Sequence, residues 1–271
     1  MGIVCLIADG PHQRYFVNRL NEAHGVDLVV IEAGRRGAAS ARRAYATGGL
    51  AGAADAIGRA ARHRLGARAR RRELDRRIGS RWRTLPPGVP CLRVDSINDP
   101  GVAVRLQAGE AELLSHGTSI ARPPLLSRAS LALNLHWGLA PYYRGVNCTA
   151  WALIGWDPCN IGVTVHEMTA EIDGGPIFGQ ARAAVGSDDT LDSIRMQLTY
   201  LGTEIMVEAI RRLRAGEQLS LTAQDISLGR LTLKRDWTAR HRRDVERIER
   251  DGTIARMLAS PSRRELPIVA V

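Results

Sequence analysis

The chain has few aromatic residues, few cysteines and no long hydrophobic run. Only 4% of its 271 residues are aromatic. No apolar stretch approaches the roughly 20 residues that cross a bilayer, so we expect no membrane span. The four cysteines show no C-x-x-C spacing, which is typical of reduced thiols and gives no sign of a metal site or a disulfide framework. The opening MGIVCLIADG lacks the basic leader of a signal peptide, so we expect a cytoplasmic protein.

Lysine is almost absent. All but one of the 38 basic residues are arginine. Fifteen arginines and three acidic residues lie between Arg35 and Arg83, so this segment holds all of the excess behind the net charge of +10. Its Ala-rich and Arg-rich composition predicts a helical insertion over about 35–83. Three interpretations stay open: a solvated helical face, a surface that attracts an anionic substrate, and a nucleic-acid surface. The scarcity of aromatic residues there makes nucleic acid the least favoured.

Outside this segment, strand signals alternate with helix signals. The pattern favours an α/β fold, a Rossmann-like and mainly parallel sheet with helices on both faces. The expected strands lie at 3–8, 26–33, within 84–94, and at 111–117, 131–136, 161–168 and 176–185. The expected helices cover 11–23, two or three turns after Pro100, and a long stretch that Ser187 to Thr190 cap and Gly216 ends.

These signals divide the chain into a main domain, 1–215, and a C-terminal extension, 216–271. The apolar alternation of LSLTAQDISLGRLTLK predicts a β-hairpin over 219–234. A charged helix should follow from Trp237 to about Leu258. Because an alternating edge strand can pair with a second chain, the hairpin is a candidate homodimer contact.

The stretch SLALNLHWGLAPYYRG places an amide and an imidazole at the end of an apolar strand. Asn134 and His136 alternate with leucines, so both polar side chains point to one face of the sheet. Burying these groups without partners costs a few kcal/mol, so they are either satisfied by neighbours or held for a ligand. In open α/β sheets, ligands bind at the carboxyl ends of the strands.

The second stretch, GVTVHEMTAEIDGGPI, runs from a strand into a loop that contains Asp173. An aspartate before two glycines and a proline is ordinarily a turn former. Beside Asn134 and His136, however, it completes a set that can take a proton from an amine and stabilise an oxyanion. These roles suit acyl transfer by direct attack, without a nucleophilic side chain.

The motifs NLHWGLAPYYRG, GVTVHEM and IDGGPI, in this order, resemble the folate-dependent formyltransferase family. The resemblance covers about residues 90–210 well and the first 35 loosely. It implies that Asn134, His136 and Asp173 are catalytic in a formyltransferase domain, and that 10-formyltetrahydrofolate is the donor, with no metal. It also implies donor contacts in two loops, at Thr118, Ser119 and Ile120, and at Ala170, Glu171 and Asp173.

The resemblance implies N-formyl transfer to a primary amine of a small, anionic molecule, such as a nucleotide-linked amino sugar or a specialised metabolite. Candidate acceptor contacts are Asp9, His12, Tyr142 and Arg144, although turn or packing roles explain each equally well. The alternatives are a hydrolase of the formyl donor and a non-catalytic protein that binds through its basic surface.

Departures from the family pattern bear on the acceptor. The chain reads His136-Trp137-Gly138 where many members read His-Pro-Ser. The loop ADGPHQ lacks the Gly-Ser-Asn of the glycinamide ribonucleotide enzymes, which disfavours that substrate. The 216–271 segment is shorter than the C-terminal barrel of about a hundred residues in the methionyl-tRNA enzymes, which disfavours tRNA. The formyltetrahydrofolate hydrolases begin with a regulatory domain, which we do not expect in this chain, and this disfavours the hydrolase.

Overall fold

The computed structural model describes residues 2–33, 79–81, 83–106, 108–259 and 265–271, together with Gly49, Asp75 and Arg76. Nearly all of the Arg-rich insertion that we expected over about 35–83 lies outside the described residues.

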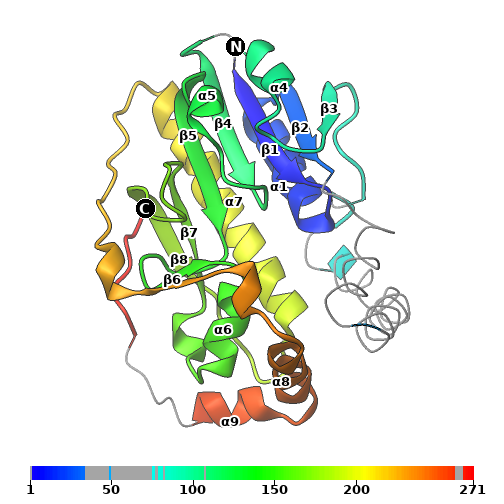
Figure 1. Ribbon diagram of the computed structural model, residues 1–271, viewed down its shortest axis with the longest axis vertical. Helices are drawn as coiled ribbons and strands as arrows, with labels where there is room; N and C mark the ends of the chain where they lie inside the picture. The colour runs from blue at the N-terminus through cyan, green and yellow to red at the C-terminus, as the bar shows by residue number, and fades with distance from the viewer. Residues whose placement is uncertain are drawn as a thin grey trace.

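A seven-stranded sheet forms the centre of the molecule, in the order β3-β2-β1-β4-β5-β7-β8 (Figure 1). The first five strands in this order are parallel, whereas β7 is antiparallel to both β5 and β8. The strands are β1 Ile3–Ala8, β2 Leu28–Glu32, β3 Cys91–Val94, β4 Ala111–His116, β5 Ala129–His136, β7 Gly162–Glu167 and β8 Ile177–Arg182. The mainly parallel α/β sheet predicted from the sequence is confirmed.

Each face of the sheet packs into its own hydrophobic core. Along β1, Ile3 and Cys5 belong to one core, and Val4 and Leu6 belong to the other. Because successive strand residues point to opposite faces, an unbroken apolar run such as Ile3–Ala8 is expected where both faces are covered. Helices therefore cover both faces, as predicted.

Helices α1 (Pro11–His24) and α7 (Leu191–Arg214) pack together on one face, and the short α4 (Pro100–Val104) and α5 (Pro123–Leu126) cover the other. At the start of α7, the N–H of Ser193 donates to Thr190 Oγ1, and the N–H of Thr190 donates to Ser193 Oγ. This reciprocal cap fixes where α7 begins. Helix α4 is shorter than predicted, because the chain turns back at Gly109 (φ 74°) to enter β4.

A lower layer holds the remaining elements (Figure 1). These are β6 Tyr143–Gly145, α6 Cys148–Ile154, the 3-10 turns Pro158–Asn160, Ile226–Leu228 and Lys234–Asp236, β9 Arg230–Thr232, α8 Ala239–Arg250 and α9 Thr253–Ala259. The expected single helix to Leu258 is broken at Gly252, whose φ of 62° ends α8.

The hairpin predicted over 219–234 does not form. Thr222 makes one antiparallel bridge to Ile177, and β9 pairs in parallel with β6. The reason is a close approach: a side chain at Gly229 would lie 1.9 Å from the carbonyl oxygen of Pro141, so only glycine lets the segment lie beside β6. The homodimer expected through that hairpin thereby loses its structural basis.

Candidate active site

Strand β5 carries Asn134 and His136 to one face of the sheet, as predicted. Their neighbours Leu133 and Leu135 belong to the core beneath α1 and α7, so the two polar side chains point to the opposite face. In the antiparallel pairing with β7, Asn134 lies opposite His166. The strand register therefore adds a second imidazole to the site.

Asp173 lies in the loop that joins β7 to β8. The loop closes where the N–H of Glu167 donates to the carbonyl of Pro176, 2.8 Å away. Gly175 is essential to this closure, because a side chain there would lie 2.1 Å from the Glu167 carbonyl oxygen. Asp173 itself adopts a φ of 47°, which is uncommon for a residue with a side chain and is found at functional sites.

The Asp173 carboxylate is the centre of the site. Its Oδ2 accepts the N–H of Gly145 at 2.8 Å and lies 3.3 Å from His136 Nδ1. Its Oδ1 lies 3.4 Å from His166 Nε2 and accepts from Asn134 Nδ2 at 3.5 Å. The structure thus brings the three predicted catalytic residues together.

The charge state of Asp173 follows from these neighbours. Burial would raise the pKa of the carboxyl group. The charges of His136 and His166, the hydrogen bond from His166 and the N–H of Gly145 outweigh burial and hold this pKa well below its ordinary value of 3.8. Asp173 is therefore a carboxylate at neutral pH. It can stabilise a protonated imidazole, but it is a poor permanent proton acceptor.

His136 has an oxygen acceptor at each ring nitrogen. Its Nε2 donates to the carbonyl of Tyr143 at 3.0 Å, and its Nδ1 faces the Asp173 carboxylate. Only the doubly protonated ring can donate in both directions. Each ring nitrogen of His136 therefore has an oxygen that can accept its proton when that nitrogen is protonated.

His166 is the residue that sequence reasoning missed. Its Nδ1 donates to the carbonyl of Glu167 at 2.8 Å, while its Nε2 lies 3.2 Å from Asn134 Nδ2. A proton that reaches Nε2 would be held by Asp173. The histidine is visible in the sequence motif GVTVHEM. Its place in the site depends on the antiparallel pairing of β7 with β5, which the motif alone does not predict.

The segment that carries these residues is similar to proteins of a known family. Residues 102–210 match a family model described as formyl transferase. This segment belongs to the folate-dependent formyltransferase family. The match covers nearly the same residues as the resemblance seen in the motifs, and it contains both strands that carry the site.

Several curated methionyl-tRNA formyltransferases are similar to this formyl transferase segment. The Anaeromyxobacter dehalogenans enzyme is 31% identical over 170 residues, which cover 59% of this chain and 54% of the enzyme. The Rhodopirellula baltica enzyme is 36% identical over 136 residues, covering 49% and 40%. The chain therefore spans about half the length of these curated relatives.

Two solved structures share the fold of this chain. A Mycobacterium tuberculosis protein superposes with a TM-score of 0.55 at 20% identity, covering 100% of this chain and 96% of that chain. An N-formyltransferase from Helicobacter canadensis, solved with folinic acid and dTDP-3-aminofucose, superposes with a TM-score of 0.56 at 12% identity, covering 88% and 73%. At these identities the likeness shows the fold.

The predicted donor loop after β4 is held by its own side chains. Thr118 Oγ1 lies 2.9 Å from Ser115 Oγ, and Ser119 donates through its N–H and its hydroxyl to Glu32. These contacts occupy the polar groups of Thr118 and Ser119. Ile120, in contrast, is 49% exposed and offers apolar surface that a flat ring can cover.

In the predicted donor loop before Asp173, Ala170 and Glu171 are exposed. The backbone on either side of them is fixed, because Met168 N–H donates to the Ala132 carbonyl and Gly174 N–H to the Glu171 carbonyl. Ala170, Glu171 and Ile120 are thus accessible to a ligand, and their role toward the donor stays a prediction.

The residues predicted to contact the acceptor have diverse environments. Asp9 forms ion pairs with Arg14 at 2.7 Å and Arg93 at 3.0 Å. Tyr142 is half-buried next to the site. Arg144 is buried, and its guanidinium donates to the carbonyls of Ile172 and Ile226. This placement favours a role for Arg144 in holding the Asp173 loop.

His12 joins a stack of rings beside the site. It makes an edge contact with Trp137, the residue after His136, and Trp137 makes another with His116, at centroid distances of 4.9 and 5.0 Å. Burial lowers the pKa of His12 to about 3 and that of His116 to about 4. Both rings are therefore neutral at physiological pH.

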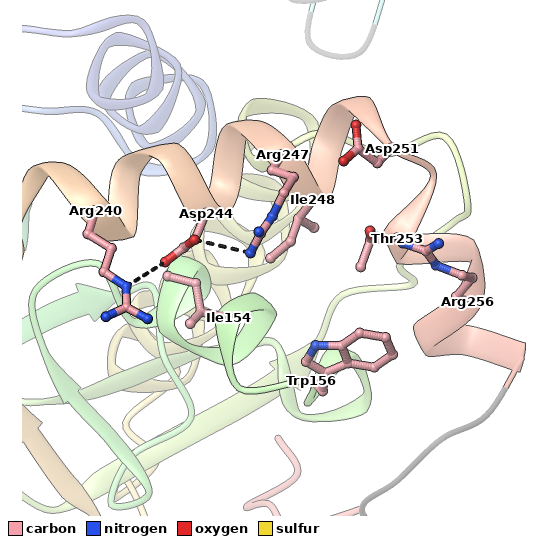
Figure 2. A pocket seen from close by; sticks show the side chains of 9 residues that line it. All are labelled: Ile154, Trp156, Arg240, Asp244, Arg247, Ile248, Asp251, Thr253 and Arg256. Carbon is pink, nitrogen blue, oxygen red and sulfur yellow. Dashed lines mark hydrogen bonds and ion pairs between the residues drawn. The ribbon is translucent and has the colours of Figure 1, made fainter.

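A separate hollow of about 420 Å³ lies beneath α8 and α9. Figure 2 shows the side chains that line it. Asp244 pairs with Arg247 at 3.2 Å and Arg240 at 3.9 Å, and Arg256 donates to Thr253 Oγ1 at 2.6 Å. The charged side chains of this hollow largely bind one another, and none of the lining residues carries an imidazole or a thiol. The hollow is lined by Ile154, Trp156, Arg240, Asp244, Arg247, Ile248, Asp251, Thr253 and Arg256.

The described part of the chain has neither a cluster suited to a metal ion nor a helix suited to a membrane span. No group of three or more His, Cys, Asp or Glu side chains there is arranged to hold a metal ion. None of the helices among those residues is both long and apolar enough to cross a membrane.

Proposed function

We propose that the chain is an N-formyltransferase that moves the formyl group of 10-formyltetrahydrofolate to a primary amine of a small molecule. The observation that carries the proposal is the Asp173 carboxylate, which lies within 3.5 Å of Asn134 Nδ2, His136 Nδ1 and His166 Nε2. A nucleotide-linked amino sugar is the acceptor class that we favour, because the Helicobacter canadensis structure holds dTDP-3-aminofucose on the same fold.

In the proposed reaction, the acceptor amine attacks the formyl carbon, and the bond from that carbon to the folate nitrogen then breaks. The tetrahedral intermediate carries an oxyanion, for which the amide of Asn134 and the imidazolium of His136 are the donors. In this structure His136 Nε2 donates to Tyr143, so donation to the oxyanion requires that hydrogen bond to be shared or exchanged.

The proton lost by the amine must reach the departing folate nitrogen. Asp173 remains ionised, so we assign it the task of orienting His136 and stabilising the imidazolium, while the histidines carry the proton. His166 Nε2, 3.4 Å from Asp173 Oδ1, is the second position where the proton can be held.

The first test is His136→Asn. Asparagine keeps one donor but cannot carry a second proton, so we expect turnover to fall about 10²–10⁴-fold. Binding of tetrahydrofolate, measured by calorimetry, should change little. An active His136→Asn enzyme would refute the role given to the imidazole.

The acceptor is tested by mixing the protein with 10-formyltetrahydrofolate and a panel of amines. Transfer that requires an amine supports the proposal. Release of formate without any amine would instead support the hydrolase, and neither reaction would support a non-catalytic binding protein.

A second candidate acceptor is methionyl-tRNA. The observation in its favour is the 31% identity with a methionyl-tRNA formyltransferase. Aminoacylated initiator tRNA therefore belongs in the same panel. Formylation of the tRNA with no reaction of the sugar nucleotides would replace the small-amine proposal.

A further inference from the structure

The C-terminal tail, defined here as residues 265–271, runs beside β8 (Figure 1). The N–H of Gln180 donates to the carbonyl of Val269 at 2.8 Å, and the N–H of Val269 donates to Gln180 Oε1 at 3.0 Å. Gly179 leaves room for the tail, because a side chain there would lie 2.1 Å from Val271 Cγ2. At the end of β8, Arg182 also donates to the carbonyl of Leu266 and pairs with Glu265 at 3.6 Å. The tail is therefore fixed to β8 at the buried Gln180 and at Arg182.

Gln180 connects the tail to the loop that follows His136. Its Nε2 donates to the carbonyl of Ala140 at 2.7 Å and to Thr164 Oγ1 at 2.9 Å. Thr164 Oγ1 in turn accepts the N–H of Ala140 and donates to the carbonyl of Gly138. Every donor of these two side chains is used, and each side-chain oxygen accepts at least one hydrogen bond. The N–H of Val269 and the carbonyl of Ala140 together fix the orientation of the amide, because only Oε1 can accept from the first and only Nε2 can donate to the second.

A second path joins the tail to His136 from the other side. The N–H of Leu266 donates to Asn160 Oδ1 at 2.8 Å, and Asn160 Nδ2 donates to Asp157 Oδ1 at 2.7 Å. Asp157 also accepts the hydroxyl of Tyr143. The carbonyl of Tyr143 is the group that accepts from His136 Nε2. Asp157 and Asn160 are both buried.

We propose that the C-terminal tail is a positioning element for the active site. Val269 acts through Gln180 on residues 138–140, and Leu266 acts through Asn160, Asp157 and Tyr143 on the imidazole of His136. The proposal rests on the formyl-transfer function assigned above. The reactive orientation of His136 thus depends on a segment about 130 residues away in the sequence.

The test uses the full chain with Val269→Pro. Proline removes the N–H that orients Gln180 and leaves the Val269 carbonyl as an acceptor for the Gln180 N–H. The matched control is Ala270→Pro, which changes the neighbouring residue, whose N–H makes no hydrogen bond in the described structure. Both variants lie in an extended tail, so we expect melting temperatures close to that of the wild type.

Three readouts separate positioning from general damage. We expect kcat of Val269→Pro to fall about 10-fold, since misplacing a catalytic group by a fraction of an ångström is costly, while KM for donor and acceptor stays within about twofold. With ¹⁵N-labelled histidine, the Nε2–H signal of His136, assigned from its loss in His136→Asn, should shift or exchange faster in Val269→Pro. Ala270→Pro should leave kcat and this signal unchanged.

The proposal is overturned if Val269→Pro keeps the kcat and the His136 signal of the control, or if both prolines lower kcat equally. If the wild type transfers formyl to no acceptor, the proposed function fails. The histidine signal then decides the positioning proposal alone: a change specific to Val269→Pro supports it, and an unchanged spectrum refutes it.

Discussion

Gly138 stands where the imidazole of His136 meets the carbonyl of Tyr143. A side-chain carbon at Gly138 would lie 2.5 Å from His136 Nε2 and 2.6 Å from the Tyr143 oxygen, both far inside contact distance. Gly138→Ala should therefore separate these two atoms and turn the ring away from Asp173. We expect kcat to fall about 10–100-fold with folate binding retained, as measured by steady-state kinetics and calorimetry.

The control for this glycine is Gly186→Ala. The added carbon there would lie 3.7 Å from Asp189 Oδ2, an ordinary contact, and Gly186 precedes α7 away from the site. Its activity should equal that of the wild type. Equal activity of the two alanine variants would show that the His136–Tyr143 contact is not needed for catalysis.

At the scale of single residues, the sequence predicts the polar groups of the site but not all of their partners. Asn134, His136 and Asp173 could be found because amide, imidazole and carboxylate follow strand signals in a known motif order. His166 could not be assigned, because its position opposite Asn134 depends on the antiparallel register of β7. Tyr143 contributes a backbone carbonyl, a group that every residue carries and that no side-chain motif reports.

The short strand β6 contacts the site through the carbonyl of Tyr143, the side chain of Arg144 and the N–H of Gly145. Arg144 on this strand donates to Ile172, the residue before Asp173, and to Ile226 in the turn before β9. Arg144→Lys keeps the charge but cannot reach two carbonyls with a planar fork. If Arg144 holds the Asp173 loop, kcat should fall about 10-fold with KM for the acceptor unchanged.

The same variant separates this role from the acceptor contact predicted from the sequence. A side chain that binds the acceptor directly contributes to ground-state binding, so its replacement would raise KM for the acceptor with a smaller change in kcat. Kinetics measured at saturating donor and varied acceptor distinguish the two outcomes. A purely higher acceptor KM would restore the substrate role of Arg144.

The central elements were predictable because their patterns are complete within short windows. Ile3–Ala8 was predicted with its bounds, and Thr190 marked the start of α7. The pairing of segment 219–234 was not predictable, because apolar alternation indicates a strand but does not indicate which strand it pairs with. Here the partner is β6, and the pairing depends on Gly229 fitting against Pro141. Long-range contacts of this kind are decided by shape and not by periodicity.

For the molecule as a whole, buried histidines link stability to acid pH. Burial lowers the pKa of His116 to about 4, and a hydrogen bond with the backbone of Leu135 offsets only part of this effect. In the unfolded chain the same group takes up a proton near its ordinary pKa of 6.5. Between these two values the unfolded state binds more protons than the native state. The stability that neutral His116 contributes is therefore fully present above pH 6.5, and it is lost as the pH falls from 6.5 toward 4.

We expect His116 alone to lower the free energy of unfolding by about 2–3 kcal/mol between pH 7 and pH 4.5. His12 acts in the same direction, with a pKa of about 3. Asp173, whose pKa lies below its ordinary value, contributes only at pH values under about 4.

Denaturant unfolding of the wild type and His116→Leu at both pH values isolates the histidine, because leucine fills a similar volume and does not titrate. Between pH 7 and pH 4.5, the free energy of unfolding should fall by about 2–3 kcal/mol less in the variant than in the wild type. An identical fall in both proteins would show that His116 is protonated in the native state.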